Sequence, residues 1–266
     1  MGTVLPEDRY RCGACGVNQF SLENRNIVVT GAGRGLGRAI AEAVAAAGAS
    51  VELVARTETQ LIEAKATIEK AGGLAQVHCA DLSDPTAIAD LGRELSDRRV
   101  DGVVHAAGVT HRADAQEFGD AAFARVLAVN LAAPFMLSRE LMRHREGATP
   151  SSHVFIGSLG SSIAIPRAVA YVASKAGLLG VVRTLAAEWA TSGARVNAIS
   201  PGYFRTELTA EVLDKPDELA RMESRIPMRR LGLPEELGGA AVFLLSDASS
   251  YVTGQQIVVD GGWLAS

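Results

Sequence analysis

The sequence is organised around one stretch, Ile27-Val28-Val29-Thr30-Gly31-Ala32-Gly33-Arg34-Gly35-Leu36-Gly37. Its first three residues are a short apolar run typical of a buried parallel strand, and a helical pattern over residues 39–47 follows the glycines. Glycines let the backbone come close to a pyrophosphate, and a helix N-terminus points free amides at the phosphates. A glycine triplet alone is also compatible with an ordinary tight turn. The order strand, glycine turn, helix indicates a dinucleotide-binding unit.

Strand-like and helix-like segments alternate through the next hundred residues. The predicted strands cover residues 51–54, 74–79 and 102–105, and the predicted helices cover 58–71 and 85–97. This alternation indicates βαβ units, whose right-handed crossovers place helices on both faces of a parallel sheet. We therefore predict an α/β fold, a single-domain doubly wound (Rossmann-type) parallel sheet of about seven strands. Its ligand site is expected where the first and fourth strands end, because the strand order reverses there.

The rest of the chain continues the same pattern. We expect a long helix at about 120–145, strands at 154–156, 196–199 and 256–259, a helix that contains Tyr171 and runs to about residue 190, a loop and helix over 203–225, and a last helix opened by Pro234. Residues 1–20 have no sustained period and are expected to be a flexible N-terminal extension. Residues 21–266 form the predicted dinucleotide-binding and catalytic domain.

Composition limits the possible partners. The chain has 266 residues and a net charge of −4, with neither sign gathered into a long run, which argues against nucleic acid or an anionic membrane as a partner. No apolar stretch spans a bilayer without glycine or charge, and the first twenty residues lack the apolar core of a secretory signal. The expectation is a cytoplasmic protein that acts on a small molecule.

The three cysteines do not predict a metal site. Cys12 and Cys15 form a lone C-x-x-C pair, Cys79 is far away in the sequence, and the five histidines are scattered. A structural zinc needs a second pair of ligands, so we predict that no metal is bound. An odd number of cysteines also suits a reducing compartment.

A second stretch, Tyr171-Val172-Ala173-Ser174-Lys175, places a phenol and an ammonium on one face of a predicted helix. A nearby ammonium favours the phenolate and brings the pKa of a tyrosine closer to neutral pH, which makes the pair an acid/base device. Such a pair also occurs on solvated helix faces, so its interpretation depends on the other motifs.

Together these motifs resemble the short-chain dehydrogenase/reductase family over about residues 21–263. The resemblance is carried by Thr30-Gly31-x-x-x-Gly35-x-Gly37, Asp81, Ala106-Ala107-Gly108, Asn130, Ser158, Tyr171-x-x-x-Lys175 and Pro201-Gly202. Ser158 precedes Tyr171 by thirteen residues, the spacing found in that family. Within the family, Asn130 to Phe135 and the tail from Pro227 to Gly262 most resemble 3-oxoacyl-acyl-carrier-protein reductases and gluconate 5-dehydrogenases.

The resemblance implies a hydride transfer between a nicotinamide and a ketone or secondary alcohol. Tyr171 would give or take the proton, Lys175 would lower the pKa of Tyr171 and hold the nicotinamide ribose, and Ser158 would bond the substrate oxygen. Asn130 would interrupt a helix and feed a water-borne proton relay. Two alternatives stay open, since Ser158 could be a turn serine and Asn130 could bond its own helix backbone.

The resemblance also implies a set of cofactor-binding residues. Asp81 would contact the adenine amino group, and Thr206 would bond the nicotinamide carboxamide. The complete set is Gly31, Arg34, Gly35, Leu36, Gly37, Arg56, Asp81, Leu82, Ala107, Gly108, Tyr171, Lys175, Pro201, Gly202 and Thr206. One departure is His105-Ala106-Ala107-Gly108, where the family usually has Asn-Asn-Ala-Gly, and the role of His105 is left open.

The choice of cofactor is predicted from the end of the second strand. NAD-selective relatives place an acid there, whereas this chain has Ala55 followed by Arg56, with Arg34 in the glycine turn. Two guanidinium groups can bind the 2′-phosphate of NADP(H). We therefore predict NADP(H) as the cofactor.

Three functions remain as hypotheses, of which the first is an NADP(H)-dependent carbonyl reductase or alcohol dehydrogenase. The second is an epimerase or dehydratase that retains NAD, although such relatives usually carry an added substrate domain. The third is a non-enzymatic NADPH-binding regulator, which would fit best without the Ser, Tyr and Lys. The segment 203–225 would set the substrate, and an acyl thioester, a steroid and a sugar acid all stay open. The resemblance to the family also implies a homotetramer.

Overall fold

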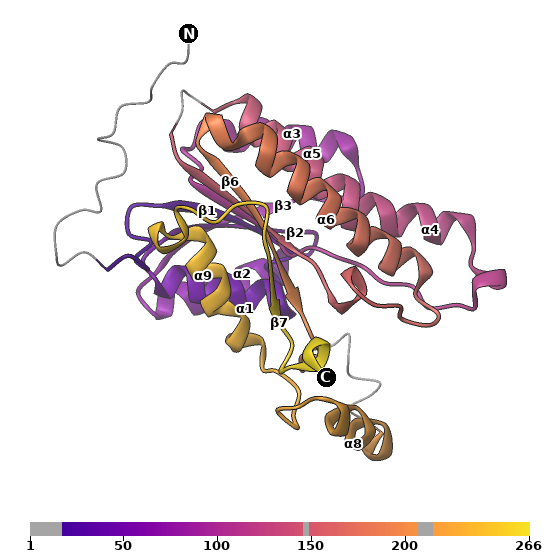
Figure 1. Ribbon diagram of the computed structural model, residues 1–266. Coiled ribbons are helices and arrows are strands. Elements are labelled where there is room, and N and C mark those ends of the chain that lie inside the picture. Colours follow the sequence, from indigo (N-terminus) through magenta and orange to yellow (C-terminus); the bar gives the residue numbers. More distant parts are fainter. Residues whose placement is uncertain (1–17, 146–148, 207–214) are drawn as a thin grey trace, which may run out of the picture.

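Seven parallel strands form one sheet in the computed structural model, which describes residues 18–145, 149–206 and 215–266 (Figure 1). The strands lie in the order β3-β2-β1-β4-β5-β6-β7. Their bounds are β1 Asn26–Thr30, β2 Ser50–Ala55, β3 Leu74–Cys79, β4 Gly102–His105, β5 Ser151–Ile156, β6 Ala194–Pro201 and β7 Gln256–Val259. The predicted doubly wound sheet of seven strands is confirmed.

Helices cover both faces of the sheet. One face carries α1 (Gly35–Ala46), α2 (Glu58–Lys70) and α9 (Gly238–Leu245), and the other carries α3 (Pro85–Ser96), α4 (Asp120–Leu127), α5 (Ala133–Arg143) and α6 (Val169–Trp189) (Figure 1). Fully buried side chains such as Ile40, Leu53 and Leu244 fill the first interface, and Leu95, Leu137 and Leu178 fill the second. One further helix, α8 (Pro216–Arg225), lies away from the sheet and near the C-terminus (Figure 1).

The strand order reverses beside β1. This strand pairs with β2 on one side and with β4 on the other, as the sequence predicts. The turns that follow β1 and β4 therefore lie next to each other at the carboxyl edge of the sheet, where ligands bind in folds of this kind.

The long helix predicted at 120–145 is interrupted around Asn130, as the resemblance implies. A π-helical turn, Ala128–Ala132, separates α4 from α5. Pro134 has no backbone N–H and cannot donate to the carbonyl of Asn130 four residues earlier, which removes one α-helical bond at this point. The turn places Asn130 in a fully buried position.

Two strands are longer than their apolar runs indicated. β5 begins at Ser151, three residues before its predicted start, because Ser152 and His153 are hydrogen-bonded inside the core. Ser152, for example, donates to the carbonyl of Leu244 over 2.7 Å. β6 likewise runs from Ala194 to Pro201. The predicted flexibility of residues 1–20 and the Cys12 and Cys15 pair fall almost wholly outside the described residues.

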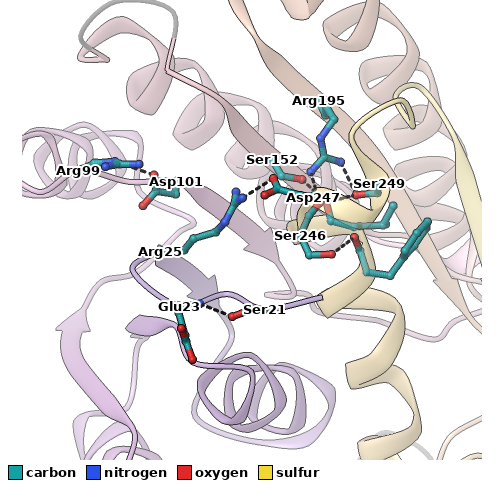
Figure 2. A network of polar contacts seen from close by, with 12 residues as sticks. Ser21, Glu23, Arg25, Arg99, Asp101, Ser152, Arg195, Ser246, Asp247 and Ser249 are labelled. Carbon is teal, nitrogen blue, oxygen red and sulfur yellow. Dashed lines mark hydrogen bonds and ion pairs between the residues drawn. The ribbon is translucent and has the colours of Figure 1, made fainter. Parts of the chain in front are cut away.

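A polar network closes the amino edge of the sheet (Figure 2). Arg195, at the start of β6, donates to Ser249 Oγ over 2.7 Å and to the carbonyl of Ser246 over 3.2 Å. Arg25 forms an ion pair with Asp247 in the same loop. Burial lowers the pKa of Arg195 to about 10, so the guanidinium stays charged near neutral pH. The network fastens the loop after α9 to the edge opposite the predicted ligand site.

Two described helical stretches, Asp120–Arg143 and Val169–Ser192, are long and apolar enough to cross a membrane by length and composition alone. Both belong to the helical layer over β4, β5 and β6 (Figure 1). Because core helices of α/β domains share these properties, the two stretches are weak support for a membrane span.

Glu52 and His78 form a buried ion pair between β2 and β3. His78 Nε2 lies 2.6 Å from Glu52 Oε2, and its Nδ1 lies 2.8 Å from Glu94 Oε1. Only a protonated imidazole can donate from both ring nitrogens, so the two carboxylates raise the pKa of His78, led by the bond to Glu52. Glu52 also accepts from Asn26 and contacts Arg98, and hydrogen bonds led by that of His78 lower its pKa in spite of burial.

We expect this pair to make the stability of the fold dependent on pH. The contribution of His78 is fully present below its ordinary pKa of 6.5 and is lost as the pH rises through the raised folded-state value. Glu52→Gln should lower the free energy of unfolding at mildly acidic pH by about 1–3 kcal/mol and flatten its decline toward alkaline pH. Denaturant titrations from pH 6 to pH 9 measure both effects. Glu63→Gln is the matched control, since that side chain is 69% exposed on α2. An unchanged pH slope in Glu52→Gln would contradict the assignment.

Candidate active site

A cavity of about 600 Å³ opens at the carboxyl edge of the sheet. It brings together every predicted site residue except Asn130, which lies behind it beside Val129. The predicted residues that line it are Gly31, Arg34, Gly35, Leu36, Gly37, Arg56, Asp81, Leu82, Ala107, Gly108, Ser158, Tyr171, Lys175, Pro201, Gly202 and Thr206. Residues more than 170 positions apart in the chain therefore converge on one cavity.

The glycine turn forms a cradle in which side chains do not fit. Gly31 has φ +69°, and a Cβ added there would lie 2.8 Å from the Cα of Ala107 in the turn after β4. Gly35 has φ +56° and is the first residue of α1, whose N-terminal amides face the cradle. Close backbone approach beside a helix N-terminus fits a pyrophosphate.

Two arginines lie at the predicted ribose end of the cavity. Arg34 is the N-cap residue of α1, and Arg56 follows β2 directly. Asp81 lines the same end, and one of its carboxylate oxygens accepts from both the N–H and the hydroxyl of Ser83. These two bonds lower the pKa of Asp81, so it is a carboxylate at neutral pH. Asp84 caps α3 by accepting from the N–H of Thr86.

The predicted acid/base residues meet at the other end. Tyr171 lies in the first turn of α6, Lys175 lies one turn later, and Ser158 follows β5. Lys175 Nζ donates to the carbonyl of Ile156 over 2.7 Å and lies 5.8 Å from the centre of the Tyr171 ring. Ser161 donates to the carbonyl of Lys175 over 2.9 Å, which ties the turn after β5 to α6. The same turn holds Ser158 Oγ, which accepts from Gly160 N over 3.1 Å, as a turn serine does.

The pKa values of this group differ from the prediction. Burial raises the pKa of Tyr171, while the hydrogen bond to Ser158 and the charge of Arg112 act in the lowering direction. The predicted lowering by Lys175 is not seen, because its ammonium is directed to the carbonyl of Ile156. Burial lowers the pKa of Lys175 itself to about 8. The resting arrangement therefore holds a protonated phenol, the form that can donate to a carbonyl oxygen.

Asn130 connects the interrupted helix to the cavity wall. Its Oδ1 accepts from the N–H of Val109 over 2.8 Å, and its Nδ2 donates to the carbonyl of Val109 over 2.9 Å and to Ser174 over 3.2 Å. The alternative that it bonds its own helix backbone is wrong. These contacts fix the segment after Gly108 against α6, and the proton relay stays a prediction.

His105 replaces the asparagine of related turns with a buried network. Its Nε2 lies 2.7 Å from Ser138 Oγ, which lies 3.0 Å from His153 Nδ1, and its ring lies 4.6 Å from that of Phe155. A hydroxyl has one proton, so one ring nitrogen donates to Ser138 and the other accepts from it. Burial holds the pKa of His105 well below its ordinary value and lowers that of His153 to about 3. Both rings are neutral and link β4, β5 and α5.

Sequence reasoning missed Arg112. It lines the cavity four residues after Gly108, and its charge acts on the Tyr171 phenol. A position just beyond the carboxyl end of β4 could have indicated it, since ligands in this class of fold bind there. Among the described residues, no group of three or more histidines, cysteines or acids is placed to hold a metal.

The fold and this cavity define a nicotinamide-dependent oxidoreductase of the doubly wound class. The family model described as enoyl-(acyl carrier protein) reductase matches residues 31–264, so the chain belongs to the short-chain dehydrogenase/reductase family. It is 39% identical over 250 residues to 2-dehydro-3-deoxy-D-gluconate 5-dehydrogenase of Bacillus subtilis (strain 168), covering 92% of this chain and 97% of that protein.

Solved structures agree with this assignment. A crystal structure of a Beutenbergia cavernae protein with NADP bound at low occupancy has a TM-score of 0.91 and 43% identity, covering 94% of this chain and all of that one. Gluconate 5-dehydrogenase of Burkholderia cenocepacia J2315, in complex with NADP and tartrate, has a TM-score of 0.89 and 30% identity, covering 93% and 98%. The chain is therefore an oxidoreductase of the gluconate 5-dehydrogenase type.

Tyr171→Phe should lower kcat by about 10²–10⁴ because it removes the proton donor and keeps the ring. The dissociation constant for NADPH, measured by its fluorescence, should stay within about twofold of that of the unmodified enzyme, since cofactor contacts are spread over the whole cradle. Turnover is followed by absorbance of NADPH at saturating substrate. Reduction rates near those of the unmodified enzyme would rule out the role of the phenol.

Proposed function

We propose that the protein is an NADP(H)-dependent dehydrogenase that interconverts a secondary alcohol and a ketone on a sugar acid. The observation that carries the proposal is the position of Arg112, a cation in the same cavity as Ser158, Tyr171 and Lys175 and near enough to act on the Tyr171 phenol. A guanidinium there can bind the carboxylate of a sugar acid through two parallel hydrogen bonds. The relative from Burkholderia cenocepacia holds a hydroxy dicarboxylate, tartrate, together with NADP.

Each residue of the group has a part in the reaction. Ser158 holds the substrate oxygen, and Tyr171 donates a proton to that oxygen during reduction or accepts it during oxidation. When bound, the nicotinamide supplies or accepts the hydride at the adjacent carbon. Lys175 would hold the nicotinamide ribose, and Asn130 keeps the wall that carries Arg112 in place. Hydride and proton together convert the carbonyl into the alcohol.

NADP(H) as the cofactor is supported by the arginines at the ribose end. Ala55 occupies the end of β2, where an acid would repel a 2′-phosphate, and Arg56 and Arg34 both line the cavity. Hydrogen bonds to charged groups contribute about 1.5–3 kcal/mol each before solvent screening reduces them. Half of the sum of two such contributions, about 1.5–3 kcal/mol, corresponds to a preference of tenfold or more.

The preference for NADPH over NADH should therefore be at least about tenfold in kcat/KM. Arg56→Ala should remove most of this gap by weakening NADPH and leaving NADH unchanged. Arg93→Ala is a matched control, because that side chain is 67% exposed on α3. Steady-state kinetics give kcat/KM with NADPH and with NADH for each variant. Equal efficiency in the unmodified enzyme, or a variant that loses both cofactors alike, would contradict the role of Arg56.

Arg112→Met keeps an unbranched apolar side chain comparable to the aliphatic part of arginine and removes the guanidinium charge. It should raise the KM for D-gluconate about 10–100-fold, as expected for the loss of charged hydrogen bonds, and should change the KM for an uncharged polyol such as galactitol much less. Arg93→Met serves as the control. The test is the ratio of kcat/KM values for the two substrates with NADP⁺. An unchanged ratio would show that Arg112 does not bind the carboxylate.

A cytoplasmic homotetramer is proposed on the family resemblance. The other two hypotheses have weaker support. An epimerase or dehydratase that retains NAD would need a larger substrate domain, and a non-enzymatic regulator would not need the group of Ser158, Tyr171 and Lys175.

A further inference from the structure

The C-terminal turn is fixed against the cofactor end of β6. Gly202 donates to the carbonyl of Val259 over 2.8 Å, and a Cβ added at Gly202 would lie 2.6 Å from the Cα of Asp260. Asp260 accepts from the backbone N–H of Gly262 and of Leu264, each over 2.8 Å. These bonds hold the short helical turn Trp263–Ala265 next to the segment that lines the cavity.

Trp263 occupies the space between the cavity wall and α8. Its ring lies 4.9 Å from the ring of Tyr203 at an interplanar angle of 62°. The guanidinium of Arg225, the last residue of α8, lies 4.4 Å from the centre of the Trp263 ring. The three side chains come from the loop after β6, the C-terminal turn and α8, and they stack in the order Tyr203, Trp263, Arg225. Figure 1 shows α8 and the C-terminus at the same end of the molecule.

Tyr203 connects this stack to the reacting group. It lines the cavity with Tyr171 and Arg112, and it is near enough to influence the phenol of Tyr171. A second tie between α8 and the same loop is the ion pair of Glu223 with Arg205, whose atoms are 3.5 Å apart. None of the residues of α8 is fully buried. Among the described residues, Glu223 and Arg225 attach the C-terminal end of α8 to the loop after β6 and to Trp263.

We propose that Trp263 is a positioning residue for substrate, which holds Tyr203 against the cavity and couples that wall to α8 through Arg225. This inference deepens the proposed function and rests on it for the identity of the substrate. Aromatic pairs and cation–π contacts each contribute modestly, so the stack can set the affinity for substrate without being required for folding. The cofactor end of the cavity does not depend on it, because that end is built by strand ends and the glycine turn.

The test compares Trp263→Ala, Trp263→Phe and the control Tyr251→Ala, whose side chain is 99% exposed. Trp263→Ala should raise the KM for D-gluconate at least about fivefold at saturating NADP⁺, while kcat and the dissociation constant for NADPH stay within about twofold. Trp263→Phe retains a ring for both neighbours and should restore the KM to within about twofold. Tyr251→Ala should match the unmodified enzyme.

Hydrogen exchange of residues 216–225 in the NADPH-bound enzyme gives a measurement that needs no substrate. Exchange in α8 should be at least about fivefold faster in Trp263→Ala than in Tyr251→Ala, because the stack no longer holds the helix end. Unchanged exchange, or a loss of kcat at constant KM, would overturn the inference. Failure of the unmodified enzyme to oxidise D-gluconate would instead contradict the proposed function, and the exchange measurement would then decide the inference by itself.

Discussion

The close approach of two backbone turns is the constraint on which the rest of the site depends. Gly31 after β1 lies so near Ala107 after β4 that a single added carbon would come within 2.8 Å of the Ala107 backbone. The approach is possible because β1 and β4 are neighbours in the sheet, and they are neighbours because the strand order reverses there. The same edge receives Ser158 from β5 and Gly202 from β6, so a cofactor seated on the glycine turn extends toward the acid/base residues. The reversal of strand order beside β1 therefore determines the direction in which the cavity runs.

Much of the fold could be predicted because its signals are local. Strand and helix periods repeat within a few residues, and the spacing of Tyr171 and Lys175 on one helix face needs no tertiary information. The missed features depend on distant partners. β5 begins three residues early because Ser152 and His153 form hydrogen bonds with residues of α9 and α5. These polar residues break the apolar pattern from which a strand is predicted. The break at Asn130 was implied only by the family resemblance, because the bonds that complete it join Asn130 to Val109, 21 residues away. Arg112 carries no local pattern and reaches the cavity only through the placement of its loop.

Histidine shows how the same side chain acquires opposite charge states inside one core. His78 lies between two carboxylates, and both of its ring nitrogens must donate, so its pKa rises. His105 and His153 share one hydroxyl, which can accept from one ring and donate to the other, so both remain neutral and their pKa values fall. Burial alone would lower all three. The hydrogen-bond partner therefore decides the sign of the pKa shift. The His105 network links β4, β5 and α5 without placing a charge beside the turn that follows β4.

The cofactor end of the cavity is built mainly from backbone, whereas the substrate end is built from loop side chains. The cofactor end consists mainly of strand ends and backbone, where a change of side chain at Gly31 or Gly202 would collide with a neighbouring strand or turn. At the substrate end, Arg112 and Tyr203 come from loops held by Asn130 on one side and by Trp263 on the other. Such side chains can change without disturbing the sheet, because their supports lie outside it. A family with one fold and one cofactor geometry can therefore vary its substrates through these loops and supports, and the role proposed for Trp263 would extend that variable region to the C-terminal turn.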